Sequence, residues 1–151
     1  QALAFRWLTR IGQLKRLDPA RRIFWFLIVK GHRTYRYLPV FARTFIPHWK
    51  ESHVPHRDFL RHVAQRQFGE FYNEETGLIE FPESRGHLRK ELAHPSSREL
   101  QIPAVRFFLK RNPKYLNGHE LACFCELSRE NLKPMARRLF DKGFYESLGA
   151  S

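Results

Sequence analysis

The residues best suited to chemistry are a histidine and two cysteines near the C-terminal end. His119 and Cys123 are four positions apart, which on a helix places them on one face, while Cys125 points elsewhere. A thiol beside an imidazole is the arrangement of a cysteine nucleophile, and the same residue types bind zinc. Zinc takes four ligands, commonly from two Cys-x-x-Cys pairs, and the second pair is absent. The sequence favours cysteines that are buried as small apolar groups, and a Cys–His enzyme is the third-ranked hypothesis.

Further histidines are spread over residues 48–62. His53 and His56 are three apart, but Pro55 lies between them and no carboxylate accompanies them in a familiar metal-binding pattern. The sequence also has no Gly-rich phosphate loop, nucleophile elbow or paired-carboxylate motif. We therefore predict no catalytic residues, no metal and no cofactor, and we infer no small-molecule substrate. The histidines of this segment are His48, His53, His56 and His62.

Charge is the strongest remaining signal. The 151 residues include 27 Lys and Arg against 15 Asp and Glu. Residues 1–50 hold eleven of these cations and one acid, Asp18, whereas residues 51–151 hold sixteen cations and fourteen acids. The asymmetry indicates an anionic partner for the first region, either nucleic acid, a lipid headgroup surface or an acidic protein. The alternative is that these cations only solubilise an aromatic-rich surface.

The composition indicates a folded intracellular protein. Hydrophobic residues make up 42% of the chain and aromatic residues 15%, which is sufficient for a core. No stretch approaches the ~20 apolar residues of a membrane span. Two cysteines exclude a disulfide scaffold and favour a reducing compartment, either cytoplasmic or mitochondrial.

Between residues 33 and 49, arginines alternate with aromatic residues. Aromatic faces can stack on unpaired bases while arginines neutralise phosphate, as in single-stranded nucleic-acid binding. The same mixture suits a membrane interface, and the structural alternative is a core-facing aromatic stripe with arginine stems lying along it. The residues concerned are Arg33, Tyr35, Arg36, Tyr37, Phe41, Arg43, Phe45 and Trp49.

Apolar residues in the segment 2–17 follow the spacing of one helical face, and cations lie mostly on the other side. A basic amphipathic helix suits a membrane surface, and it also has the composition of a mitochondrial transit peptide. A terminal helix packed on its own domain is the equally weighted alternative. The apolar set is Leu3, Ala4, Trp7, Leu8, Ile11 and Leu14.

The C-terminal run HELACFCELSRENLKPMARRLFDKGFYESL predicts a helix through Cys125, a turn, a second helix capped by Asn131, and an extended FYES segment. This spacing, over about residues 113–148, resembles the helix-turn-helix and first wing strand of a winged-helix domain. In that family the second helix presents basic side chains to the major groove, although many members bind only proteins. Pro134 departs from the pattern, so the second helix must begin late or kink. The positions matching the basic side chains are Arg129, Lys133, Arg137 and Arg138.

Periodicity and turn residues predict the remaining elements. A helix spans residues 19–30, with Asp18 as its cap and Gly31 after its last turn. Further helices follow Pro55 up to Gly69, over residues 84–93, and from Pro103 to residue 111. A β-hairpin covers residues 71–81, with its turn at 73–77. The predicted fold is mostly α (α+β), a helical domain with one small β-hairpin and a helix-turn-helix-like C-terminal part.

We divide the chain into a basic, aromatic-rich N-terminal helical region, residues 1–50, and a near-neutral globular helical region, residues 51–151. The predicted function is a non-catalytic basic subunit that docks on nucleic acid, with RNA in a ribonucleoprotein complex favoured and other protein subunits as partners. The alternative is a peripheral subunit of a membrane-bound assembly that lies on anionic lipid. The residues predicted to contact nucleic acid or another anionic surface are Arg6, Arg10, Lys15, Arg16, Arg21, Arg22, Arg33, Tyr35, Arg36, Tyr37, Arg43, Arg129, Lys133, Arg137 and Arg138.

Overall fold

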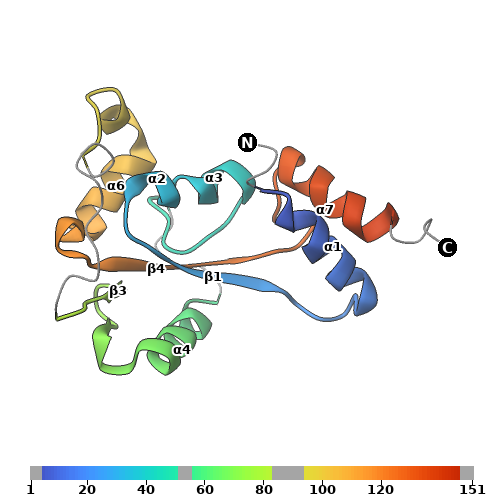
Figure 1. Cartoon of the computed structure of the whole chain (residues 1–151), viewed down its shortest axis with the longest axis horizontal. Coiled ribbons are helices and arrows are strands. Elements are labelled where there is room, and N and C mark those ends of the chain that lie inside the picture. Colours follow the sequence, from blue (N-terminus) through green and yellow to red (C-terminus); the bar gives the residue numbers. More distant parts are fainter. Residues whose placement is uncertain (1–4, 51–55, 83–93, 147–151) are drawn as a thin grey trace. The chain divides into compact units, whose positions relative to one another are not determined.

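The computed structural model describes residues 5–50, 56–82 and 94–146, shown in Figure 1. The chain forms two compact units. Unit 1 comprises Gln1–Trp25, Pro39–Thr44 and Cys125–Ser151, and unit 2 comprises Phe26–Leu38 and Phe45–Phe124. The units do not follow the charge boundary at residue 50, because each draws on residues from both sides of it. Unit 1 holds twelve cations and five acids, and unit 2 fifteen cations and ten acids.

Unit 1 is built on two long helices, α1 (Trp7–Leu17) and α7 (Pro134–Glu146), which lie side by side in Figure 1. Glycine 12 meets the backbone near Phe140, and Gly143 meets the backbone near Thr9, so the two helices are antiparallel. An aromatic cluster completes the core of this unit. The Phe41 ring, at the end of α3 (Tyr37–Phe41), lies 5.1 Å from Trp25 and 5.8 Å from Phe5, measured between ring centroids.

Asn131 joins the loop segments of unit 1. Its Oδ1 accepts hydrogen bonds from the Thr44 amide at 2.9 Å and the Thr44 hydroxyl at 2.7 Å. Its Nδ2 donates to the carbonyls of Thr44 and Glu126, at 3.0 and 2.8 Å, and its own carbonyl accepts from the Arg43 amide. One side chain thus satisfies backbone groups of two segments distant in the sequence.

Unit 2 contains α2 (His32–Tyr35), α4 (Arg57–Phe68) and α6 (Pro103–Arg111). Three-residue 3-10 helices occupy Gly69–Phe71, Glu99–Gln101 and Tyr115–Asn117. Tyr35 lies at the centre of the core, fully buried, with its ring about equally close to Phe107 and Phe108, at 5.9 and 6.1 Å. Burial of such large rings removes a large apolar area from water and so stabilises the unit.

A four-stranded sheet has the order β1-β4-β3-β2. The strands are β1 (Phe24–Val29), β2 (Tyr72–Asn73), β3 (Leu78–Ile79) and β4 (Glu120–Glu126). β2 and β3 form the hairpin, with Tyr72 opposite Ile79, and β3 pairs antiparallel with β4, with Leu78 opposite Leu121. The observed fold is therefore α+β, with more sheet than the sequence predicted.

Two predicted helices are wrong, because residues 24–29 and 120–126 are strands. Both are short apolar runs, and periodicity alone does not separate such a run from a buried helix segment. The helix-turn-helix resemblance fails with the second of them, since a strand stands where its first helix was expected. The expected wing strand is wrong as well, because α7 continues through Gly143 to Glu146.

Other predictions are confirmed. α7 begins at Pro134, as the position of that proline required, and α6 begins at Pro103. α4 ends at Phe68, directly before Gly69, whose φ of 53° lies in the left-handed region. The hairpin turn falls at residues 73–77 as predicted. The helix predicted over residues 84–93 lies outside the described residues.

Candidate anion-binding site

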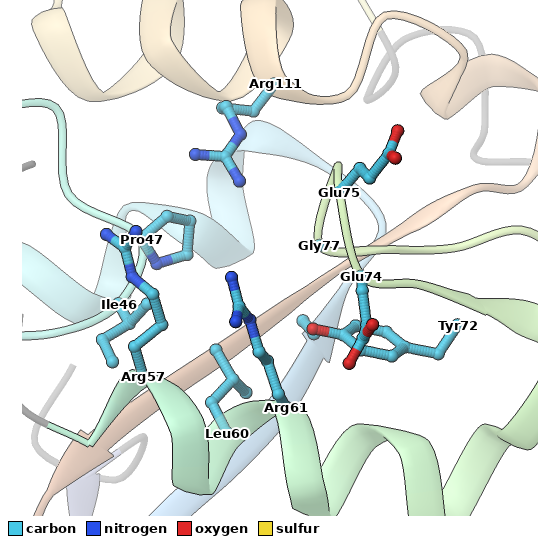
Figure 2. A pocket seen from close by; sticks show the side chains of 11 residues that line it. Ile46, Pro47, Arg57, Leu60, Arg61, Tyr72, Glu74, Glu75, Gly77 and Arg111 are labelled. Atoms are coloured by element: carbon cyan, nitrogen blue, oxygen red, sulfur yellow. The ribbon is translucent and has the colours of Figure 1, made fainter.

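Three arginines of unit 2 line one cavity of about 190 Å³. Arg57 and Arg61 come from α4, and Arg111 is the last residue of α6. Figure 2 shows the three guanidinium groups directed into the same space from opposite sides. The cavity is also lined by apolar side chains, by two glutamates and by a turn of the hairpin: Ile46, Pro47, Leu60, Tyr72, Glu74, Glu75, Gly77 and Ala122.

α4 positions the first two arginines through helical spacing. Arg57 and Arg61 are four residues apart and therefore share a face. Leu60 and Ala64 are buried and hold the helix against the rest of unit 2. The nearest acid to Arg61 on this helix is Asp58, at 3.8 Å, with a side chain that is 99% exposed. Such an exposed pair contributes little, so Arg61 remains available to an external anion.

The hairpin turn positions Arg111. Asn73 Oδ1 accepts hydrogen bonds from the amides of Glu75 and Thr76, at 3.0 and 3.3 Å, which fixes the turn. Arg111 Nη2 donates to the Thr76 carbonyl at 2.9 Å. Gly77 has a φ of 76°, and a Cβ at this position would lie 3.3 Å from Arg111 Nη2. The positive φ of the turn therefore favours glycine, whereas a Cβ would require only a small shift of the guanidinium.

Tyr72 and two glutamates complete the polar lining. Burial raises the pKa of Tyr72; Arg61 and Arg111 oppose that shift, and Glu74 reinforces it. The phenol therefore keeps its proton at neutral pH and can donate a hydrogen bond. Figure 2 shows its ring beside Arg61 and Glu74. Glu74 and Glu75 are exposed and lie where the hairpin turn meets solvent.

The wall formed by Pro47 is held by a buried hydrogen bond. The Tyr35 hydroxyl donates to the Pro47 carbonyl at 2.5 Å, and both residues are buried. Tyr35 was predicted to stack on a base, but its complete burial prevents this in the structure. Its role is to anchor the cavity wall. Tyr37, two residues later, is 46% exposed and remains a candidate for stacking.

This arrangement is suited to an anion. The three arginines outnumber the two glutamates of the lining, so their mutual repulsion is only partly balanced, and an anion bound between them would reduce it further. Guanidinium groups donate forked pairs of hydrogen bonds that match the oxygens of phosphate and carboxylate. The apolar lining residues Ile46, Leu60 and Ala122 lower the local dielectric constant beside the arginines, which strengthens each of these interactions.

The predicted cations of unit 1 fall into two groups. The first group has side chains already engaged within the unit. Arg22 forms two hydrogen bonds with Glu126, at 3.0 and 2.6 Å, and Arg129 forms two with Asp141, at 3.0 and 3.2 Å. Lys133 Nζ donates to the Pro39 carbonyl. These side chains stabilise the unit and are less available to a ligand.

The second group is open to an external anion. Four side chains have no hydrogen bond or ion pair with any residue of the described ranges: Arg6, Arg43, Arg137 and Arg138. The remaining predicted cations make weak exposed contacts. Lys15 donates to the Arg21 carbonyl, Arg21 lies 3.8 Å from Asp18, Arg10 donates to Gln13, and Arg16 lies over the Phe144 ring.

In unit 2, two predicted cations share one acid. Arg33 Nε and Arg36 Nη1 each lie 3.6 Å from Glu99 Oε2, and the buried His32 lies 3.7 Å from the same atom. A hydrogen bond from the Ser96 backbone, aided by these neighbouring groups, lowers the pKa of Glu99. Burial lowers the pKa of His32, so its ring is neutral at pH 7. Arg33 and Arg36 are thus partly neutralised.

The cysteine and histidine candidates do not form a site. Cys123 and Cys125 are both buried free thiols, as predicted, but they lie on a strand and not on a helix. Burial raises the pKa of Cys125 to about 12, which keeps it protonated and unreactive. Four extended residues span about 13 Å, so His119 is too far along the chain to activate Cys123. Among the described residues, no group of three His, Cys, Asp or Glu could hold a metal ion.

Part of the apolar face of α1 packs inside unit 1, while Leu14 is exposed. Leu8 is fully buried, and the Trp7 ring lies 5.0 Å from Trp25. This is the predicted alternative of a terminal helix packed on its own domain; Leu3 lies outside the described residues. In the part of the chain that the structure describes, no helix has the length and hydropathy of a membrane span.

No protein family, curated protein sequence or solved structure matches this chain. The cavity arginines were missed by the sequence analysis. The spacing of Arg57 and Arg61 on a predicted helix was the only available signal for them, and nothing near Arg111 in the sequence indicated that it would join them.

Proposed function

We propose that the protein is a non-catalytic basic subunit that docks on RNA and holds one phosphate of that RNA in the arginine cavity of unit 2. The observation that carries the proposal is the convergence of Arg57, Arg61 and Arg111 on one space. Convergent guanidinium groups recognise phosphate oxygens by shape as well as by charge. The excess of 27 cations over 15 acids would draw a polyanion towards the protein from a distance.

RNA in a single-stranded or irregular form is favoured over duplex DNA. A concave site needs a phosphate that can turn inward, which a flexible strand provides and a rigid duplex does not. The C-terminal segment that resembled a DNA-reading motif begins with a strand, so that support for DNA is lost. The exposed Tyr37 supplies an aromatic face on which an unpaired base can stack.

Unit 1 would supply a second set of phosphate contacts through its unengaged cations, among them Arg137 and Arg138 on α7. The membrane alternative has less support. Of the side chains that would insert into lipid, Leu8 is fully buried in the core of unit 1 and Trp7 packs on Trp25, whereas Leu14 is 39% exposed. Further protein subunits remain predicted partners in a ribonucleoprotein complex.

The test is the salt dependence of binding to a short single-stranded RNA, measured by fluorescence anisotropy, beside sedimentation with anionic phospholipid vesicles. We expect the logarithm of the affinity for RNA to fall with the logarithm of salt concentration by about 0.7 for each phosphate contacted. Several contacts should therefore give a steep slope. RNA affinity that stays flat between low and physiological salt, or vesicle binding without RNA binding, would overturn the proposal.

A further inference from the structure

We infer that the arginine cavity takes the terminal phosphate monoester of an RNA chain and not an internal phosphodiester, so that the protein recognises an RNA end. This inference rests on the proposed function and specifies the ligand of the same site. It is carried by the number of arginines, the size of the cavity and the position of the two glutamates.

The number of guanidinium groups matches a monoester. An internal phosphodiester has one negative charge and two free oxygens. A terminal phosphate has three free oxygens and a charge of about −1.5 to −2 at pH 7. Arg57, Arg61 and Arg111 approach from two helices on opposite sides of the cavity, so a group with three free oxygens can engage all of them. A diester, with two free oxygens and a single charge, would offer fewer acceptor sites and neutralise the three guanidinium groups less fully.

The cavity is too small to enclose a whole nucleotide. Its volume of about 190 Å³ is below the ~300–1,000 Å³ of pockets that enclose drug-sized ligands. The occupant is therefore a small group at the end of a longer molecule, with the remainder lying outside. Tyr72 lies next to Arg61, and its protonated hydroxyl can donate a hydrogen bond to one of the phosphate oxygens.

The two glutamates disfavour an RNA strand that continues beyond the cavity in both directions. Glu74 and Glu75 are exposed and lie on the hairpin turn at the cavity. A strand passing through would bring a second phosphate past these carboxylates, and like charges repel. A chain end has a neighbouring phosphate on one side only. The carboxylates can instead accept hydrogen bonds from ribose hydroxyls of the terminal nucleotide.

The experiment compares one RNA sequence in three forms, with a 5′-phosphate, with a 3′-phosphate, and with hydroxyls at both ends. Binding to the full chain is measured by fluorescence anisotropy. We expect one of the phosphorylated forms to bind at least about tenfold more tightly than the hydroxyl form, the effect of one additional charge-assisted interaction. Whichever phosphorylated form is preferred identifies the end that is recognised. Inorganic phosphate should compete with that form and not with the hydroxyl form.

Two variants on α4 provide a matched comparison. Arg61→Gln removes a guanidinium from the cavity, whereas Arg66→Gln removes the same charge from an exposed position on the same helix that does not line the cavity. Arg61→Gln should bring the ratio of affinities for phosphorylated and hydroxyl RNA close to one, and Arg66→Gln should preserve it. Both variants are checked for unchanged thermal unfolding.

The outcomes separate the two proposals. If all three RNA forms bind with equal affinity, or if Arg66→Gln reduces the ratio as much as Arg61→Gln, the end-recognition inference is overturned while RNA binding stands. If no form binds, the proposed function fails and the inference fails with it.

Discussion

Gly12 of α1 and Gly143 of α7 bring the backbones of these two helices into direct contact within unit 1. A Cβ on Gly12 would overlap the Phe140 carbonyl, and a Cβ on Gly143 would overlap the Thr9 carbonyl. Both atoms that would be met belong to the backbone, which cannot rotate away as a side chain could. The close approach lets α1 and α7 enclose Leu8 and Phe140, which are 0% and 2% exposed.

Gly143→Ala should therefore destabilise the protein. The added methyl group must push the helices apart, and overpacking of this kind costs typically about 1–3 kcal/mol. The measurement is the free energy of unfolding in urea, followed by circular dichroism. Lys142→Ala, at the preceding exposed position, is the control and should change stability by less than about 0.5 kcal/mol. Equal effects of the two substitutions would show that α1 and α7 are not in backbone contact.

Tyr35→Phe and Tyr37→Phe compare the loss of a buried, hydrogen-bonded hydroxyl with the loss of an exposed one. Tyr35→Phe removes the hydroxyl that donates to the Pro47 carbonyl and leaves that buried acceptor unsatisfied, a loss of about 1–3 kcal/mol. Tyr37 is 46% exposed, so water can take the place of any group that its hydroxyl contacts, and its Phe variant should unfold at nearly the same urea concentration as the wild type. Because Pro47 lines the arginine cavity, Tyr35→Phe should also weaken RNA binding. A Tyr35→Phe protein with unchanged stability would contradict this hydrogen bond.

The elements that the sequence predicted correctly are those marked by local backbone chemistry. Pro103 begins α6, Pro134 begins α7, Gly69 ends α4, and the 73–77 turn forms the hairpin. Each depends on the conformations that one or two residues allow, which can be inferred without knowing the fold.

The two misassigned strands depend on distant partners. β4 is the second strand of a four-stranded sheet, and six of its seven residues are buried. Strong local signals, such as the Asn117 and Glu120 spacing of a capping box, favoured a helix there. Pairing with β3 outweighed them. The arginine cavity could not be predicted for the same reason. Arg111 and Arg61 are fifty residues apart, and they line one cavity only when the hairpin turn holds Arg111 in place.

The buried thiol of Cys125 should make stability fall at alkaline pH. Its pKa is raised from the ordinary value of 9.0 to about 12 by burial, so the folded protein holds a proton that the unfolded chain releases. The contribution of this protonated thiol to the free energy of unfolding is complete below pH 9. It is lost as the pH rises towards 12, with a slope of up to about 1.4 kcal/mol per pH unit. The measurement is the free energy of unfolding at several pH values, from below the ordinary pKa of 9.0 up to about 12.

Cys125→Ala is the control for this alkaline effect. The variant should show a shallower decline, while Tyr35, whose pKa burial also raises, contributes equally to both proteins. In addition, neither cysteine should react with a thiol reagent in the native protein, and both should react once it is unfolded. Rapid alkylation of Cys125 in the native state would contradict its burial.

Finally, the difference between engaged and unengaged cations in unit 1 should be visible in the salt dependence of RNA binding. Arg137→Gln with Arg138→Gln removes two side chains that have no partner among the described residues. If both contact phosphate, the log–log slope should decrease by about 0.7 for each. Arg22→Gln with Arg129→Gln removes the same charge, but from guanidinium groups held by Glu126 and Asp141. This second pair should leave the slope nearly unchanged and lower the stability only slightly, because exposed ion pairs contribute little. Identical slopes for the two double variants would mean that RNA responds only to net charge, and the α7 cations would then be removed from the proposed interface.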